Sequence, residues 1–151
     1  MRRKILLGLL LLFAGLQLVR PARNQGVVEG PNFVGLKHPL PAGVRPVLQR
    51  ACYDCHSNHT TYPWYAEVQP VGWWLAWHTN DGKQHLNFSE FGSYSVKRQT
   101  RVLDGVVDEI INHDMPLKSY TWVHRDAVLS PAEIKLLSDW ADSLREEIAG
   151  N

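Results

Sequence analysis

The feature that most constrains this chain is the pentapeptide Cys52-Tyr53-Asp54-Cys55-His56. It places two thiols three residues apart, and an imidazole follows the second thiol directly. On a helical turn, residues three apart lie side by side, so both thiols can reach neighbouring groups of one flat molecule. This is the C-x-x-C-H signature of c-type haem attachment, in which Cys52 and Cys55 add to the two vinyl groups and His56 binds the iron. The pentapeptide therefore predicts one covalently bound haem c with its iron.

Residues 1–22 are predicted to direct export. The basic stretch Arg2-Arg3-Lys4 precedes an apolar run from Ile5 to Val19, and no small-x-small pair follows this run cleanly. A signal peptide and an uncleaved membrane anchor through residues 5–19 both remain open. The basic start predicts that the rest of the chain lies on the periplasmic side of the cytoplasmic membrane, either anchored or soluble after signal cleavage.

The charge balance excludes one class of partner. The first 22 residues hold four basic residues and no acidic one, which leaves 12 basic against 15 acidic residues in the remainder. This acidic remainder gives no electrostatic reason to expect nucleic acid as a partner.

Three other interpretations of the cysteines are weaker. A thioredoxin-like redox pair belongs in a βαβ unit, and nothing before Cys52 has strand character. A zinc site needs four ligands, and the seven histidines form no second half-site of recognised spacing. A chance occurrence would leave two free thiols in an exported chain, where thiols tend to oxidise. Haem attachment is the interpretation that we keep.

The pattern of apolar residues predicts an all-α, cytochrome c-like domain over residues 42–149, preceded by a linker over residues 23–41. The linker has Pro and Gly every few residues and no apolar period. Apolar residues at helical spacing predict a short helix before Cys52 and an amphipathic helix from about Val96 to Asn112. Ser130-Pro131-Ala132-Glu133 is an N-cap with a capping-box glutamate, and it predicts the start of a C-terminal helix.

Met115 is the expected sixth ligand of the iron. Apart from residue 1 it is the only methionine, and it precedes Pro116 in a loop between two predicted helices. A thioether is a common partner of histidine on haem iron. A histidine ligand, above all His113, and an open site remain alternatives. His59 is expected to share the attachment helix, and a turn is expected over residues 80–82, between His78 and His85.

Aromatic residues are concentrated between the pentapeptide and this loop. Haem is a large, flat and mostly apolar molecule, which aromatic rings can cover. Trp74 is therefore a candidate for haem binding, and Lys118 and Tyr120, just after Met115, are candidate partners of the propionates.

The order of C-x-x-C-H, a Met-Pro loop and a C-terminal helix resembles class I c-type cytochromes. More specifically, Val71-Gly72-Trp73-Trp74-Leu75, the segment His85-Leu86-Asn87-Phe88-Ser89-Glu90-Phe91 and Met115-Pro116 resemble a family of exported bacterial haem-binding domain proteins. The resemblance covers roughly residues 46–145. It implies haem attachment at Cys52 and Cys55 and ligation by His56.

Together these patterns predict a mono-haem cytochrome that transfers single electrons outside the cytoplasmic membrane. Its partners would be redox proteins and the cytochrome c maturation machinery, and no catalytic residue is expected. One alternative is a haem-based sensor or peroxidase-like enzyme with an open distal face. Another is a metal-binding adaptor that docks to a membrane complex.

Overall fold

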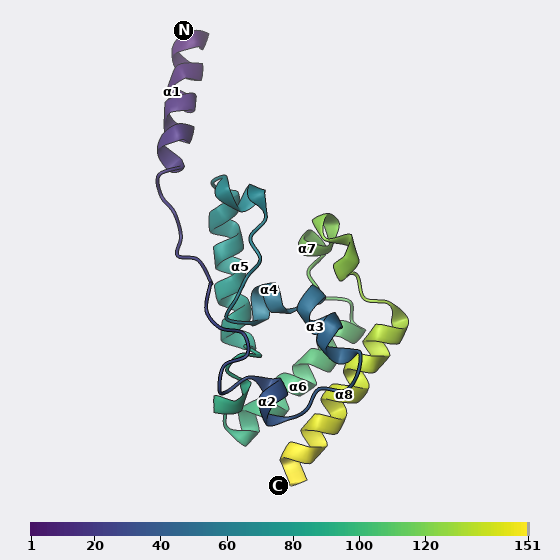
Figure 1. Cartoon of the computed structure of the whole chain (residues 1–151). Coiled ribbons are helices and arrows are strands. Elements are labelled where there is room, and N and C mark those ends of the chain that lie inside the picture. The colour runs from purple at the N-terminus through teal and green to yellow at the C-terminus, as the bar shows by residue number, and fades with distance from the viewer. Residues whose placement is uncertain (151) are drawn as a thin grey trace.

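The computed structural model describes residues 1–150 and consists of helices joined by loops (Figure 1). The α-helices are α1 (Arg2–Leu16), α2 (Val34–Lys37), α3 (Val44–Ala51), α4 (Tyr53–His56), α5 (Val71–His85), α6 (Val96–Ile111), α7 (Lys118–Val123) and α8 (Pro131–Gly150), and the 3-10 helices are η1 (Trp64–Glu67), η2 (Phe91–Ser93) and η3 (Arg125–Ala127). Within residues 1–150 the only β-type pairing is an isolated bridge between Gln25 and His59. The predicted all-α class is confirmed.

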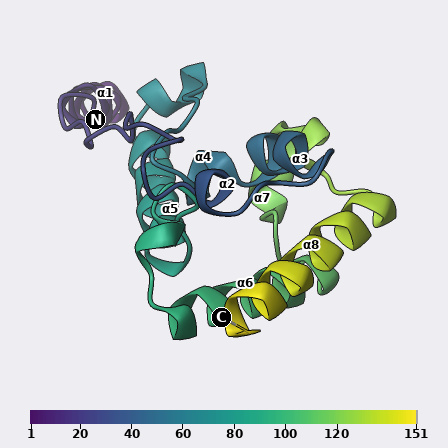
Figure 2. The same ribbon diagram turned by 60° about the horizontal axis from the view of Figure 1, so that its bottom comes forward.

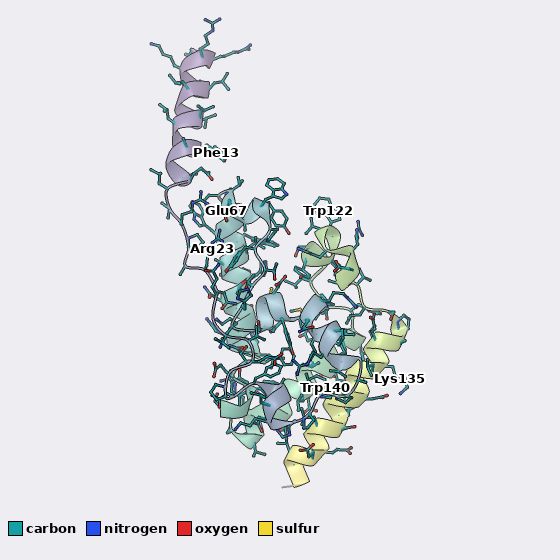
Figure 3. All side chains as sticks on the ribbon, in the orientation of Figure 1. Phe13, Arg23, Glu67, Trp122, Lys135 and Trp140 are labelled. Carbon is teal, nitrogen blue, oxygen red and sulfur yellow. The ribbon has the colours of Figure 1, made fainter. Side chains whose placement is uncertain are left out.

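The two long C-terminal helices form one layer of the molecule. In Figure 2, α6 and α8 run side by side, and α2, α3 and α4 lie on the other side of the same core. Leu137, Trp140 and Leu144 on α8 are buried in this core, and Figure 3 shows Trp140 pointing inward while Lys135 points away. Leu103 and Ile110 are the buried apolar residues of α6. Both helices therefore follow the amphipathic pattern of the sequence.

The ends of the predicted helices have identifiable causes. Helix α3 begins after Gly43, whose φ of +90° is a left-handed conformation that suits glycine. At the start of α8, the Ser130 N–H donates to Glu133 Oε2 at 2.8 Å, and the Glu133 N–H donates to Ser130 Oγ at 3.3 Å. The predicted capping box is therefore present.

Residues 23–41, which the sequence analysis treats as a linker, contribute to the core. Phe33 and Val34 are fully buried, and the Val34 N–H donates to the Phe88 carbonyl at 3.0 Å. Asn24 donates to the Ser57 carbonyl at 2.9 Å, and its own carbonyl oxygen accepts from Lys83. The packed part of the chain therefore includes residues that precede Ala42.

Two local expectations are wrong. Residues 80–82 are not a turn, because α5 is continuous through them to His85. Gly82 lies where α5 approaches α4: a Cβ there would lie 2.9 Å from the Cys55 carbonyl oxygen. His59 does not share the helix of the pentapeptide, since α4 ends at His56. Ser57 is extended, and its Oγ bonds to the backbone of His59, which replaces the next helical turn.

Helix α1 extends away from the rest of the molecule, and its apolar side chains are exposed. No helix within residues 1–150 combines the length and the apolar composition needed to cross a membrane.

Candidate functional site

A cavity of about 700 Å³ lies between the pentapeptide and helix α6. Its apolar wall includes Leu48, Leu86, Phe88, Val102, Val106 and Leu137. Cys52, His56 and Met115 line the same cavity. Cofactor sites have volumes of about 300–1,000 Å³ and mostly apolar walls, so the size and composition suit a large apolar cofactor. The structure thus brings together three of the residues that the sequence nominates.

His56 is held in one tautomer. Its Nδ1 lies 2.9 Å from the Leu86 carbonyl oxygen, an acceptor, so Nδ1 carries the proton and Nε2 keeps a free lone pair. Burial lowers the pKa of His56, which keeps the ring neutral near pH 7. A neutral imidazole whose other nitrogen is bonded to a carbonyl is the form that ligates iron or another metal.

The loop after α5 fixes His56 from both sides. Besides the bond to Leu86, the Phe88 N–H donates to the His56 carbonyl at 2.8 Å. Asn58 donates to Glu90 at 2.8 Å, and Asn87 donates to the Asn58 side-chain carbonyl at 2.8 Å. The Leu-Asn-Phe-Ser-Glu motif therefore bonds both the ring and the backbone of the candidate ligand, and it also bonds Asn58 two residues later.

The two cysteines occupy one tight turn. The Cys55 and His56 N–H groups both donate to the Cys52 carbonyl, at 3.2 and 2.9 Å. Cys52 lines the cavity, whereas Cys55 lies against Gly82 on α5. Burial raises the pKa of Cys52 to about 12 and that of Cys55 to about 11. Redox-active cysteine pairs need a lowered pKa, so these thiols lack the property that a thioredoxin-like site requires.

Met115 is positioned by the end of α6. His113 takes a left-handed conformation with φ of +59°, which turns the chain out of the helix. The N–H groups of Asp114 and Met115 then both donate to the Glu109 carbonyl, at 2.9 and 3.1 Å. His113 itself is exposed, and the histidine that shares the cavity with Met115 and His56 is His85, whose side chain is mostly exposed.

Besides Cys55, three nominated residues do not line the cavity. Trp74 is 43% exposed on α5 and packs against His78. Lys118 is exposed. The Tyr120 hydroxyl donates to Asp54 Oδ2 at 2.8 Å, and so contacts the pentapeptide from outside the cavity.

The cavity wall on α6 contains residues that the sequence analysis did not nominate: Arg98, Arg101, Gly105 and Glu109. Their spacing of three and four residues places them on one helix face, whereas the prediction for this segment used only its apolar residues. An ideal Cβ on Gly105 would have no heavy atom within 4 Å. Glycine costs about 1 kcal/mol relative to alanine inside a helix. Here it leaves space against the cavity that a flat ring can use, so the residues present fit a haem.

A helical domain in which Cys52 and His56 of a C-x-x-C-H turn share a mostly apolar cavity with a methionine defines a haem-binding protein. A family model described as "Haem-binding domain" matches residues 11–143, and the chain belongs to this family. The predicted resemblance to a haem-binding domain family is thereby confirmed. The searches of curated proteins and of solved structures gave no match.

Proposed function

We propose that this haem-binding protein is a mono-haem c-type cytochrome that transfers single electrons. Cys52 and Cys55 hold the haem through thioether bonds, and His56 and Met115 are the axial ligands. The observation that carries the proposal is that Cys52, His56 and Met115 line one cavity of about 700 Å³. Haem bound in this way supplies an iron that cycles between two oxidation states.

The protein's own residues suit electron transfer better than thiol or zinc chemistry. The raised pKa values of Cys52 and Cys55 disfavour thiolates. Within residues 1–150 no group of three or more His, Cys, Asp or Glu side chains could hold a metal ion by itself. The Leu86 carbonyl keeps His56 oriented, and the turn at Glu109 keeps Met115 in place. Two ligands held this firmly limit rearrangement when one electron is gained or lost.

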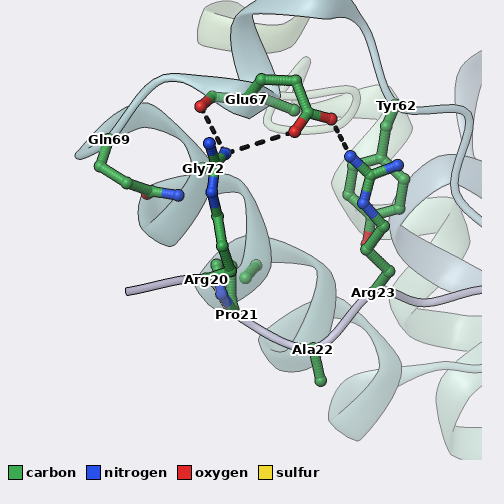
Figure 4. A pocket seen from close by; sticks show the side chains of 10 residues that line it. Arg20, Pro21, Ala22, Arg23, Tyr62, Glu67, Gln69 and Gly72 are labelled. Atoms are coloured by element: carbon green, nitrogen blue, oxygen red, sulfur yellow. Dashed lines mark hydrogen bonds and ion pairs between the residues drawn. The ribbon is translucent and has the colours of Figure 1, made fainter. Parts of the chain in front are cut away.

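We also propose that residues 1–22 direct export and that α1 remains attached to the domain. The segment after α1 is bonded to η1 and α5, as Figure 4 shows for Arg20 and Arg23, which both pair with Glu67. Gln17 and Gln69 exchange hydrogen bonds, from the Gln69 N–H at 2.8 Å and from the Gln17 side chain at 3.3 Å.

Cleavage after Ala22 would remove several of these bonds, including the one from Trp73 Nε1 to the Val19 carbonyl at 2.8 Å. Export by residues 1–22 would put the haem domain on the periplasmic side of the cytoplasmic membrane, within reach of membrane redox partners and of the cytochrome c maturation machinery. The mass of the N-terminal peptide tests the retention of α1: a mature start near Arg23 would contradict it.

Carbon monoxide tests the axial ligands. We expect the ferrous protein to show little spectral change with carbon monoxide, since Met115 occupies the sixth position, and Met115→Ala to bind it readily. Rapid binding by the unmodified protein, unchanged in Met115→Ala, would refute methionine ligation and favour the sensor or peroxidase-like alternative. His113→Ala is the matched control, and we expect it to behave like the unmodified protein.

A further inference from the structure

Arg98 lines the cavity, and the fold leaves an N–H group of its guanidinium without a hydrogen-bond acceptor. Its Nη2 donates to the Gln84 carbonyl at 3.0 Å, and its Cζ lies 4.0 Å from the centroid of the Tyr94 ring. Its Nε is buried and has no hydrogen-bond partner within residues 1–150. A buried N–H without an acceptor is costly. Arg98 is therefore held in place by Gln84 and Tyr94, and its buried Nε still lacks an acceptor.

Arg101 adds a second positive charge one helical turn later. It also lines the cavity, and within the described residues neither arginine forms an ion pair with a carboxylate. Glu109 lies eight residues after Arg101 on the same helix, about 12 Å further along its axis. The wall contributed by α6 is thus basic near α5 and acidic near Met115, and α5 adds one carboxylate to the cavity lining, Asp81.

We propose that Arg98 and Arg101 bind the two propionate carboxylates of the haem and so determine which edge of the ring faces the α5–α6 corner. The proposal deepens the function proposed above and rests on it. A guanidinium presents a planar fork of donors that matches a carboxylate. Glu109 would repel the same carboxylates from the opposite end. Arg98 and Arg101 take the role that the sequence analysis gave to Lys118 and Tyr120.

The test compares haem with its dimethyl ester, which has the same ring but no carboxylate charge. It uses the full chain carrying Cys52→Ala and Cys55→Ala, so that both ligands bind without covalent attachment. We expect this parent to bind haem at least tenfold more tightly than the ester. Adding Arg98→Gln should reduce that preference, with Arg101 retaining the remainder, while Arg125→Gln, the same charge change at an exposed residue outside the cavity, should leave it intact.

The outcomes separate recognition of carboxylates from a structural role. If Arg98→Gln weakens haem and ester equally, or leaves the preference intact, the proposal is overturned. If the parent binds neither ligand, the proposal is tested instead by the midpoint potential of the chain that keeps Cys52 and Cys55 and carries covalent haem. Loss of a positive charge beside the haem favours the oxidised iron, so Arg98→Gln should lower the potential and Arg125→Gln should not. Equal potentials in both variants would also overturn the proposal, whereas an absence of covalent haem would refute the proposed function.

Discussion

Gly82 and Gly105 both lie inside helices, but Gly82 is closely packed and Gly105 has open space beside it. Substitution by alanine should therefore have different effects on the free energy of unfolding at the two positions. Inside a helix, alanine stabilises the folded chain by about 1 kcal/mol relative to glycine. At Gly105 an added Cβ meets nothing within 4 Å. The free energy of unfolding of the haem-free Gly105→Ala chain should therefore rise by about 0.5–1 kcal/mol.

At Gly82 the added Cβ would lie 2.9 Å from the Cys55 carbonyl oxygen and 3.2 Å from the Cys55 Cβ. Overpacking of this kind costs about 1–3 kcal/mol, which meets or exceeds the gain in helix propensity. The haem-free Gly82→Ala chain should therefore unfold more easily than the Gly105→Ala chain by about 1–3 kcal/mol. Since helix propensity contributes equally to both variants, this difference isolates the close approach of α5 to Cys55.

Urea unfolding followed by far-ultraviolet circular dichroism measures both free energies, and repeating it on the haem-loaded protein adds a second comparison. If haem covers Gly105, the increase in the free energy of unfolding caused by Gly105→Ala should become smaller or change sign in the haem-loaded protein. Equal stabilities of the two haem-free variants would refute the packing of α5 on the pentapeptide. An unchanged gain at Gly105 after loading would refute the placement of the ring against α6.

Three further outcomes follow from single contacts. The Ser130 N–H and Arg50 lower the pKa of Glu133 from 4.5 to about 2, so Glu133→Gln should lower the free energy of unfolding above about pH 5. This difference from the unmodified protein should vanish as the pH falls towards 2, and pH-dependent urea unfolding would show a constant difference if the contact were unimportant. Trp140→Ala removes a buried ring and should cost about 3–5 kcal/mol by the same assay, and a loss below 1 kcal/mol would contradict its place in the core. Tyr120→Phe removes the bond to Asp54 outside the cavity, so it should cost about 0.5–1.5 kcal/mol and leave the visible spectrum of the haem unchanged, whereas a changed axial-ligand spectrum would contradict this position.

Local signals in the sequence were enough for much of the fold. The amphipathic period from Val96 and the Ser130 capping box depend on residues within a few positions of each other, and both helices are present. The pentapeptide and Met115 were nominated because their chemistry is specific, and the structure brings Cys52, His56 and Met115 to one cavity.

Contacts between distant segments could not be predicted in the same way. Phe33 and Val34 lie in a Pro- and Gly-rich stretch without apolar period, and only their packing against Phe88 and its neighbours makes them core residues. Gly82 lies inside α5 because its missing side chain lets the helix approach Cys55, a residue far away in sequence, and local patterns do not show such an approach.

The charged wall of the cavity was missed for a related reason. Arg98 and Glu109 occur on an amphipathic helix whose charged residues are normally solvated, and the sequence contains no sign that one side of this face borders a cavity. Trp74 was nominated from aromatic content alone, which cannot distinguish a ring facing the cofactor from a partly exposed ring.

Covalent attachment of haem at the pentapeptide is the central claim, and the intact mass of the chain tests it most directly. The chain is produced in cells with an active cytochrome c maturation system and measured after denaturation. We expect the polypeptide mass plus one haem, retained in acid solvent, and we expect this addition to be lost in the Cys52→Ala, Cys55→Ala double variant. A folded protein of unmodified mass, or haem that is extracted into acid solvent, would contradict the account.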